Sequence, residues 1–81
     1  MKEKVKEIIG DSLDELNLVV DNVVYEKEHG HNFLRICLDS KDIIDLDLIV
    51  KATNIINPLM DKEDIIKDEY HLDIYGKSKG N

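Results

Sequence analysis

The sequence has very little of what builds disulfide-bonded or membrane-spanning proteins. Its 81 residues include one cysteine, one proline, one phenylalanine and no tryptophan. A single cysteine excludes an intrachain disulfide framework. No stretch approaches the roughly 18 consecutive apolar residues of a transmembrane helix, and the first residues, MKEKVKEII, carry charges where a signal peptide needs an apolar run. We expect a cytoplasmic protein without membrane contact.

Positive charge is also scarce. Eighteen Asp and Glu residues against eleven Lys and Arg residues give a net charge of -7. This charge repels phosphate backbones at long range and suits a basic partner. Two lysine clusters, Lys2 with Lys4 and Lys6, and Lys77 with Lys79, can still touch RNA locally, although such clusters are more often solvated surface.

The sequence contains no convincing catalytic or cofactor motif. Cys37 lies in the middle of an expected strand, where a lone cysteine usually acts as a small apolar residue. The segment GKSKG, residues 76–80, resembles no Walker motif, because that motif must be followed by a helix and this chain ends instead. We therefore predict no catalytic residue and no cofactor.

Two groups of residues resemble metal sites only superficially. His29 and His31 flank a glycine but have no fixed third ligand. An acidic turn holds Asp39, Asp42, Asp45 and Asp47. Their spacing lacks the central glycine and the final glutamate of an EF-hand. We predict that no metal is bound.

The N-terminal segment has the apolar spacing of an amphipathic helix. Apolar residues recur at intervals of three and four: Val5, Ile8, Ile9, Leu13 and Leu16. We expect a helix from about Lys2 to Leu16. Asn17 tolerates the left-handed conformation that ends helices, and Leu18 can then fold back on Leu13 in a Schellman closure.

Two strands are expected next, joined by a tight turn. The first, from Leu18 to Glu28, is interrupted by Asp21 and Asn22, and we expect a bulge near Asp21. In the second strand, Leu34, Ile36 and Leu38 alternate with Phe33, Arg35 and Cys37. The glycine of HGHN, residues 29–32, suits a hairpin, so the strands should pair antiparallel.

A second helix should run from about Leu46 to Met60, with Asp45 as its N-cap. Its apolar arc contains Leu48, Ile49, Ala52, Ile55, Ile56, Leu59 and Met60. Because Pro58 lacks an N–H, we expect the helix to kink or end within a turn of it. A charged connection follows, which Ile65 and Ile66 should pin to the core.

A third strand completes the pattern, with Tyr70, Leu72 and Ile74 alternating with His71, Asp73 and Tyr75. The element order α-β-β-α-β predicts a two-layer α+β sandwich, with two helices on one face of a three-stranded sheet. Residues 1–75 should form the domain, and residues 76–81 a flexible tail.

The second face of the predicted sheet mixes aromatic and charged residues: Phe33, Arg35, Cys37, His71, Asp73 and Tyr75. An exposed face of this composition can bind a partner. Antiparallel sheets also commonly leave one face in solvent, so both interpretations stand.

These motifs resemble the N-terminal domain of the bacterial ribosome maturation factor RimP family. The resemblance covers LDELNLVVDNVVYEKEHGHNFLRICLDSKDIIDLDLIVKATNIINPLMD and the later YHLDIYGKSKGN. The family's pattern "LR, apolar, any, apolar, D" is similar to Leu34–Asp39, and its "leucine then acidic" helix start to Leu46 and Asp47. A late "LD" pair is echoed by Met60 and Asp61, and "Y, any, L, acidic, apolar" resembles residues 70–74.

The chain departs from the family pattern in two places. Members commonly have a Ser-Ser-Pro-Gly segment after the third strand, where this chain has Tyr75, Gly76, Lys77 and Ser78. Members also continue into a C-terminal SH3-like barrel, which is absent from this chain. We interpret the chain as an excised domain or a natural truncation.

The resemblance implies a non-enzymatic factor that binds the precursor of the small ribosomal subunit, with basic ribosomal proteins and ribosomal RNA as partners. In the full-length protein, the chain's own C-terminal domain is a further partner. Our hypothesis places the contact surface at Phe33, Arg35 and Tyr75, with Lys77 and Lys79 beside them.

Two alternatives remain open. A stand-alone KH-like module for single-stranded RNA predicts a GxxG loop between helices, but the only near match, Gly76–Gly80, follows the last strand. A purely structural domain, whose second sheet face packs on the missing barrel, is the other alternative.

Overall fold

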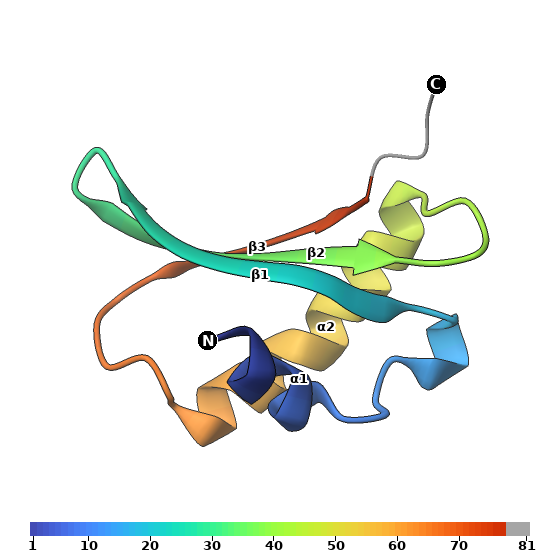
Figure 1. The fold of residues 1–81 in the computed structure, drawn as a ribbon, viewed down its shortest axis with the longest axis horizontal. Coiled ribbons are helices and arrows are strands. Elements are labelled where there is room, and N and C mark those ends of the chain that lie inside the picture. The colour runs from blue at the N-terminus through green and yellow to red at the C-terminus, as the bar shows by residue number, and fades with distance from the viewer. Residues whose placement is uncertain (78–81) are drawn as a thin grey trace.

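The computed structural model describes residues 1–77 and confirms the two-layer α+β fold. The elements are α1 (Lys2–Ile9), the short 3₁₀ helix η1 (Asp14–Leu16), β1 (Val19–Glu28), β2 (His31–Asp39), α2 (Leu46–Glu63) and β3 (His71–Gly76). Both α-helices lie on the same side of the sheet, and the other side is uncovered (Figure 1).

Strand β2 is the centre of the sheet, with β1 and β3 on either side. It pairs antiparallel with β1 and parallel with β3, so α2 forms the crossover between two parallel strands. His29 and Gly30 form the hairpin turn with φ angles of 50° and 81°. The register shifts between Val20 and Asn22, which confirms the bulge expected near Asp21.

The core forms where the helices cover the inner face of β2. Leu34, Ile36 and Leu38 are completely buried there, as their alternation predicts. Helix α1 contributes Val5 and Ile9 to this core, and α2 contributes Ala52, Ile56 and Met60. Ile66 is buried and Ile65 packs against the same cluster, which confirms that they pin the connection before β3.

The first helix is shorter than expected, and the prediction that it continues to Leu16 is wrong. Helix α1 ends at Ile9, because Gly10 takes φ 54° and ψ -128°, which no helical residue adopts. Leu13 is nevertheless buried with Val5 and Ile9, so the apolar stripe correctly identified core residues across the break.

The Schellman closure is confirmed at the end of η1. Asn17 is left-handed at φ 57°. The Leu18 N–H donates to the Leu13 carbonyl at 3.3 Å, and the Asn17 N–H donates to the Asp14 carbonyl at 3.0 Å. The chain is thereby turned into β1.

The second helix runs further than expected, to Glu63, and passes through Pro58. Asn54 and Pro58 both lie on the exposed side of α2, so the Asn54 carbonyl, which proline leaves without its helical donor, faces water. Left-handed Asp64 ends the helix, and its N–H donates to the Met60 carbonyl at 2.9 Å. At the start, the Asp45 side chain accepts a hydrogen bond from the Leu48 N–H, which confirms the N-cap.

Ordered structure also extends beyond the expected domain end at residue 75. Gly76 belongs to β3, and the Lys77 N–H donates to the Leu38 carbonyl at 2.7 Å. The remainder of the expected tail, residues 78–81, lies outside the described residues. Within residues 1–77, no helix is long and apolar enough to cross a membrane.

The Gly10 backbone generates a stability prediction. Gly10→Ala should lower the free energy of unfolding by about 1–3 kcal/mol, because a side chain is strained at this positive φ. Urea denaturation of both proteins measures the difference. Gly30→Asn is the control, since asparagine tolerates left-handed turn positions and no other atom lies near the Gly30 side-chain position. Equal losses in the two variants would contradict this explanation.

Candidate functional site

The uncovered side of the sheet, here called the open face, brings together residues from all three strands. Cross-strand partners in register share a face, so Arg35 has Val24 on one side and Asp73 on the other. Phe33 lies in the same way between Glu26 and His71. The open face contains Val24, Glu26, Glu28, His31, Phe33, Arg35, Cys37, His71, Asp73 and Tyr75.

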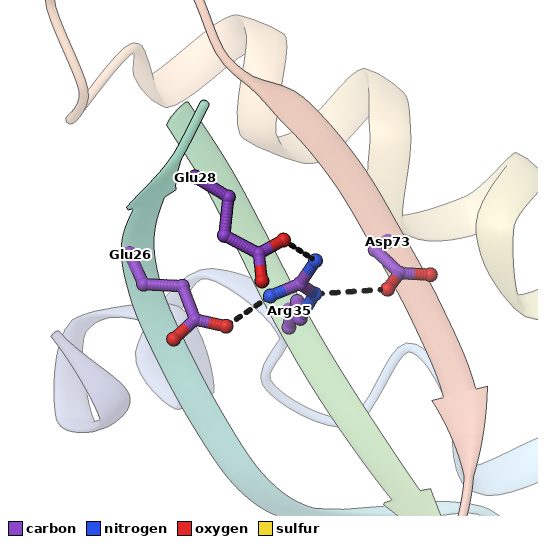
Figure 2. A network of polar contacts seen from close by, with 4 residues as sticks. All are labelled: Glu26, Glu28, Arg35 and Asp73. Carbon is purple, nitrogen blue, oxygen red and sulfur yellow. Dashed lines mark hydrogen bonds and ion pairs between the residues drawn. The ribbon is translucent and has the colours of Figure 1, made fainter. Parts of the chain in front are cut away.

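Arg35 on the central strand forms ion pairs with three carboxylates (Figure 2). Its Nη1 donates to Glu26, and its Nη2 donates to Glu28 Oε1 at 2.8 Å. Its Nε donates to Asp73 Oδ2 at 3.3 Å, so one guanidinium links β1, β2 and β3. The planar fork of arginine suits this arrangement, because its N–H groups point in several directions at once.

The network leaves the open face negatively charged. The hydrogen bond to Glu28 is the largest cause that raises the pKa of Arg35, and Glu26 and Asp73 act in the same direction. The guanidinium therefore stays charged, and one positive charge against three negative charges gives the network a net charge of -2. The carboxylates remain about half exposed, with side-chain exposures of 44–51%.

An aromatic row lies beside this network. The Arg35 guanidinium carbon is 4.7 Å from the centre of the Phe33 ring, a cation–π distance. The Phe33 and His71 ring centres are 5.1 Å apart, and those of His71 and His31 are 5.5 Å apart. Phe33 is half-buried under these neighbours. The row offers aromatic rings for contact next to the charges.

Tyr75 and Cys37 form the other end of the open face. They are direct partners in the β2–β3 register, with Tyr75 exposed and Cys37 buried. Burial, reinforced by nearby Asp21, raises the pKa of the Cys37 thiol, which therefore stays protonated near neutral pH. Partial desolvation beside Cys37 also raises the pKa of Tyr75. Neither group is activated for nucleophilic chemistry.

The structure brings together most of the residues predicted for the contact surface. Phe33, Arg35 and Tyr75 share the open face. Lys77 lies at its margin, and its Nζ is 3.4 Å from Asp21 Oδ1. Lys79 lies outside the described residues.

Sequence reasoning missed Glu26 and Glu28. Both precede the hairpin turn, and a turn of two residues pairs Glu28 with His31 and therefore Glu26 with Phe33. Counting back from the turn would have placed both carboxylates on the face of Arg35.

Side chains of the acidic turn between β2 and α2 accept hydrogen bonds from backbone N–H groups. The Ser40 N–H donates to Asp39 Oδ1 at 2.7 Å, and the Asp42 N–H donates to the Ser40 hydroxyl at 3.1 Å. Asp45 caps α2 at 2.9 Å. Across residues 1–77, no three His, Cys, Asp or Glu side chains are grouped so that they could hold a metal ion.

The fold and the open face define a small α+β domain with a charged, partly aromatic sheet surface. The family model for the RimP N-terminal domain matches residues 8–76, which is most of the chain. The chain therefore belongs to the RimP family of ribosome maturation factors, as its N-terminal domain.

The Arg35 network makes a prediction about salt and stability. Arg35→Gln should unfold at a lower urea concentration than the unchanged protein, because three neighbouring carboxylates then repel one another. The difference should shrink as sodium chloride is raised towards ~1 M, where the screening length falls to about 3 Å.

Lys67→Gln is the matched control, because Lys67 is 81% exposed and forms an ion pair with Asp64. Its urea midpoint should hardly move. An Arg35→Gln midpoint equal to that of the unchanged protein at low salt would contradict a stabilising role for the network.

Proposed function

We propose that this domain binds the immature small ribosomal subunit in the cytoplasm and assists its assembly without catalysing a covalent reaction. The observation that carries the proposal is the family match over residues 8–76. The open face supports it, since it offers half-exposed carboxylates and aromatic rings on a rigid sheet. The buried, protonated Cys37 argues against nucleophilic catalysis at this face.

The open face is the contact surface in this proposal, with Phe33, Arg35, Tyr75 and Lys77 as the described contact residues. Its charge favours basic ribosomal proteins over RNA at the centre, because a network with a net charge of -2 repels phosphates. Ribosomal RNA can be contacted at the margin, where Lys77 can reach phosphate oxygens; Lys79, also predicted for this contact, lies outside the described residues.

A partner's lysine or arginine can join the network without displacing Arg35. An ionised carboxylate accepts up to about four hydrogen bonds, and Arg35 occupies only part of that capacity on Glu26, Glu28 and Asp73. Arg35 thus acts as a positioning residue that holds three carboxylates towards an incoming cation. In a longer parent protein, the C-terminal barrel would be a further partner.

Co-sedimentation with small-subunit precursors tests this surface. Glu26→Gln with Glu28→Gln, or Phe33→Ala with Tyr75→Ala, should weaken binding on the order of tenfold, since each pair removes contacts worth about 1.4 kcal/mol or more. The control is Glu3→Gln with Glu7→Gln on α1, which makes the same charge change at exposed residues of the helical layer. That variant should bind normally.

Equal binding by the open-face and α1 variants would contradict the surface assignment. A separate titration with single-stranded RNA tests the KH-like alternative. Tight binding to RNA by this chain alone, falling steeply with salt, would favour that alternative instead. In the structure η1 and the β1–β2 hairpin lie between α1 and α2, where the sequence has no GxxG motif.

A further inference from the structure

We propose that the outer edge of β3, together with the adjoining flank of α2, binds an extended cationic protein segment by strand addition. This surface adjoins the open face at His71 but consists of the strand edge and the helix flank, so the inference goes beyond the proposed function and does not depend on it. Strand β3 is six residues long and pairs only with β2, and no strand among residues 1–77 lies against its outer edge. The outward backbone groups of such a strand can pair with another chain.

The opposite edge of the sheet is less suited to strand addition. Strand β1 has a bulge at Asp21 and carries Lys27 near its hairpin end. A bulge and an edge lysine both discourage pairing with a further strand. Strand β3 pairs with β2 in unbroken register over its whole length, from His71 to Gly76.

The flank of α2 that faces the β3 edge is apolar and exposed in the first turns of the helix. Leu46 and Val50 lie one helical turn apart and are 76% and 50% exposed. Ile43, in the turn before the helix, is 89% exposed. Large apolar side chains grouped at such exposure are typical of an interaction surface.

The same flank continues down the helix alongside β3. Thr53 and Asn57 follow Val50 at helical spacing, and they line a shallow hollow of about 580 Å³ with His71 and Leu72. At the C-terminal end of β3, Ile44 packs closely over Gly76. The helix flank and the strand edge therefore form one continuous strip, in which inward side chains of an added strand would contact Leu46, Val50 and half-buried Leu72.

The charge along the strip identifies the occupant as cationic. Asp61, Asp64, Asp68 and Glu69 line the hollow, where Lys67 is the basic side chain and is paired with Asp64. Asp42 and Asp47 are exposed at the apolar end. A second copy of the chain fits poorly, because each copy carries a net charge of -7. A segment that alternates aliphatic residues with lysine or arginine matches both the apolar and the acidic parts.

A nuclear magnetic resonance titration tests the proposal with a short acetylated peptide that alternates lysine and valine as the probe. Amide signals of β3 and of the first turns of α2 should shift, whereas signals of β1 should shift no further than lysine contacts with Glu26 and Glu28 alone would shift them. Two control peptides are an oligolysine of equal charge and the same alternating peptide with N-methyl groups along one edge. Both should bind on the order of tenfold more weakly, because one lacks apolar contacts and the other lacks backbone donors.

Variants locate the binding site on the protein. Leu46→Ser with Val50→Ser should weaken peptide binding about tenfold. Val19→Ser, at a valine of β1 that is 60% exposed, should leave it unchanged. All three positions are exposed, so circular dichroism should show both variants folded.

Several results would overturn the proposal. Equal binding of oligolysine would mean that charge alone attracts the peptide, and equal binding of the N-methylated peptide would exclude strand addition. Shifts of β3 signals that grow with protein concentration in the absence of peptide would assign the edge to a second copy of the chain.

Discussion

The burial of Leu34, Ile36 and Leu38 on one face of β2 is the constraint on which the rest of the domain depends. These side chains are completely buried beneath the helices, and β2 is the strand that joins both others. Because side chains alternate along a strand, their burial also places Phe33, Arg35 and Cys37 on the open face. A slip of one residue would exchange the two sets, so core and candidate site depend on the same register.

Arg35 lies at the centre of the open face, but its positive charge is paired with carboxylates. Its three ion pairs connect neighbouring strands and orient half-exposed carboxylates outward. The basic residue thus helps to build a negative surface. Such a surface favours cationic partners over phosphate backbones.

Local chemistry made much of the fold predictable: the Asp45 cap, left-handed Asn17 and the bulge near Asp21 each follow from neighbouring residues. The break at Gly10 was missed because the apolar spacing continues across it to buried Leu13. Helix α2 continues past Pro58 because Asn54, whose carbonyl loses its helical donor, lies on the exposed side; the prediction considered the missing N–H of Pro58 and not the position of its acceptor. The pairing of Arg35 with Glu26, Glu28 and Asp73 depends on register between strands, so composition alone could not identify it.

Photo-crosslinking from the open face tests the central claim most directly. A benzophenone amino acid in place of Tyr75, which is 42% exposed, should form an adduct with a basic ribosomal protein when the domain is irradiated on small-subunit precursors. The same probe in place of Glu7, exposed on α1, should give much less product. An adduct with ribosomal RNA alone, or equal yields from the two positions, would contradict the account.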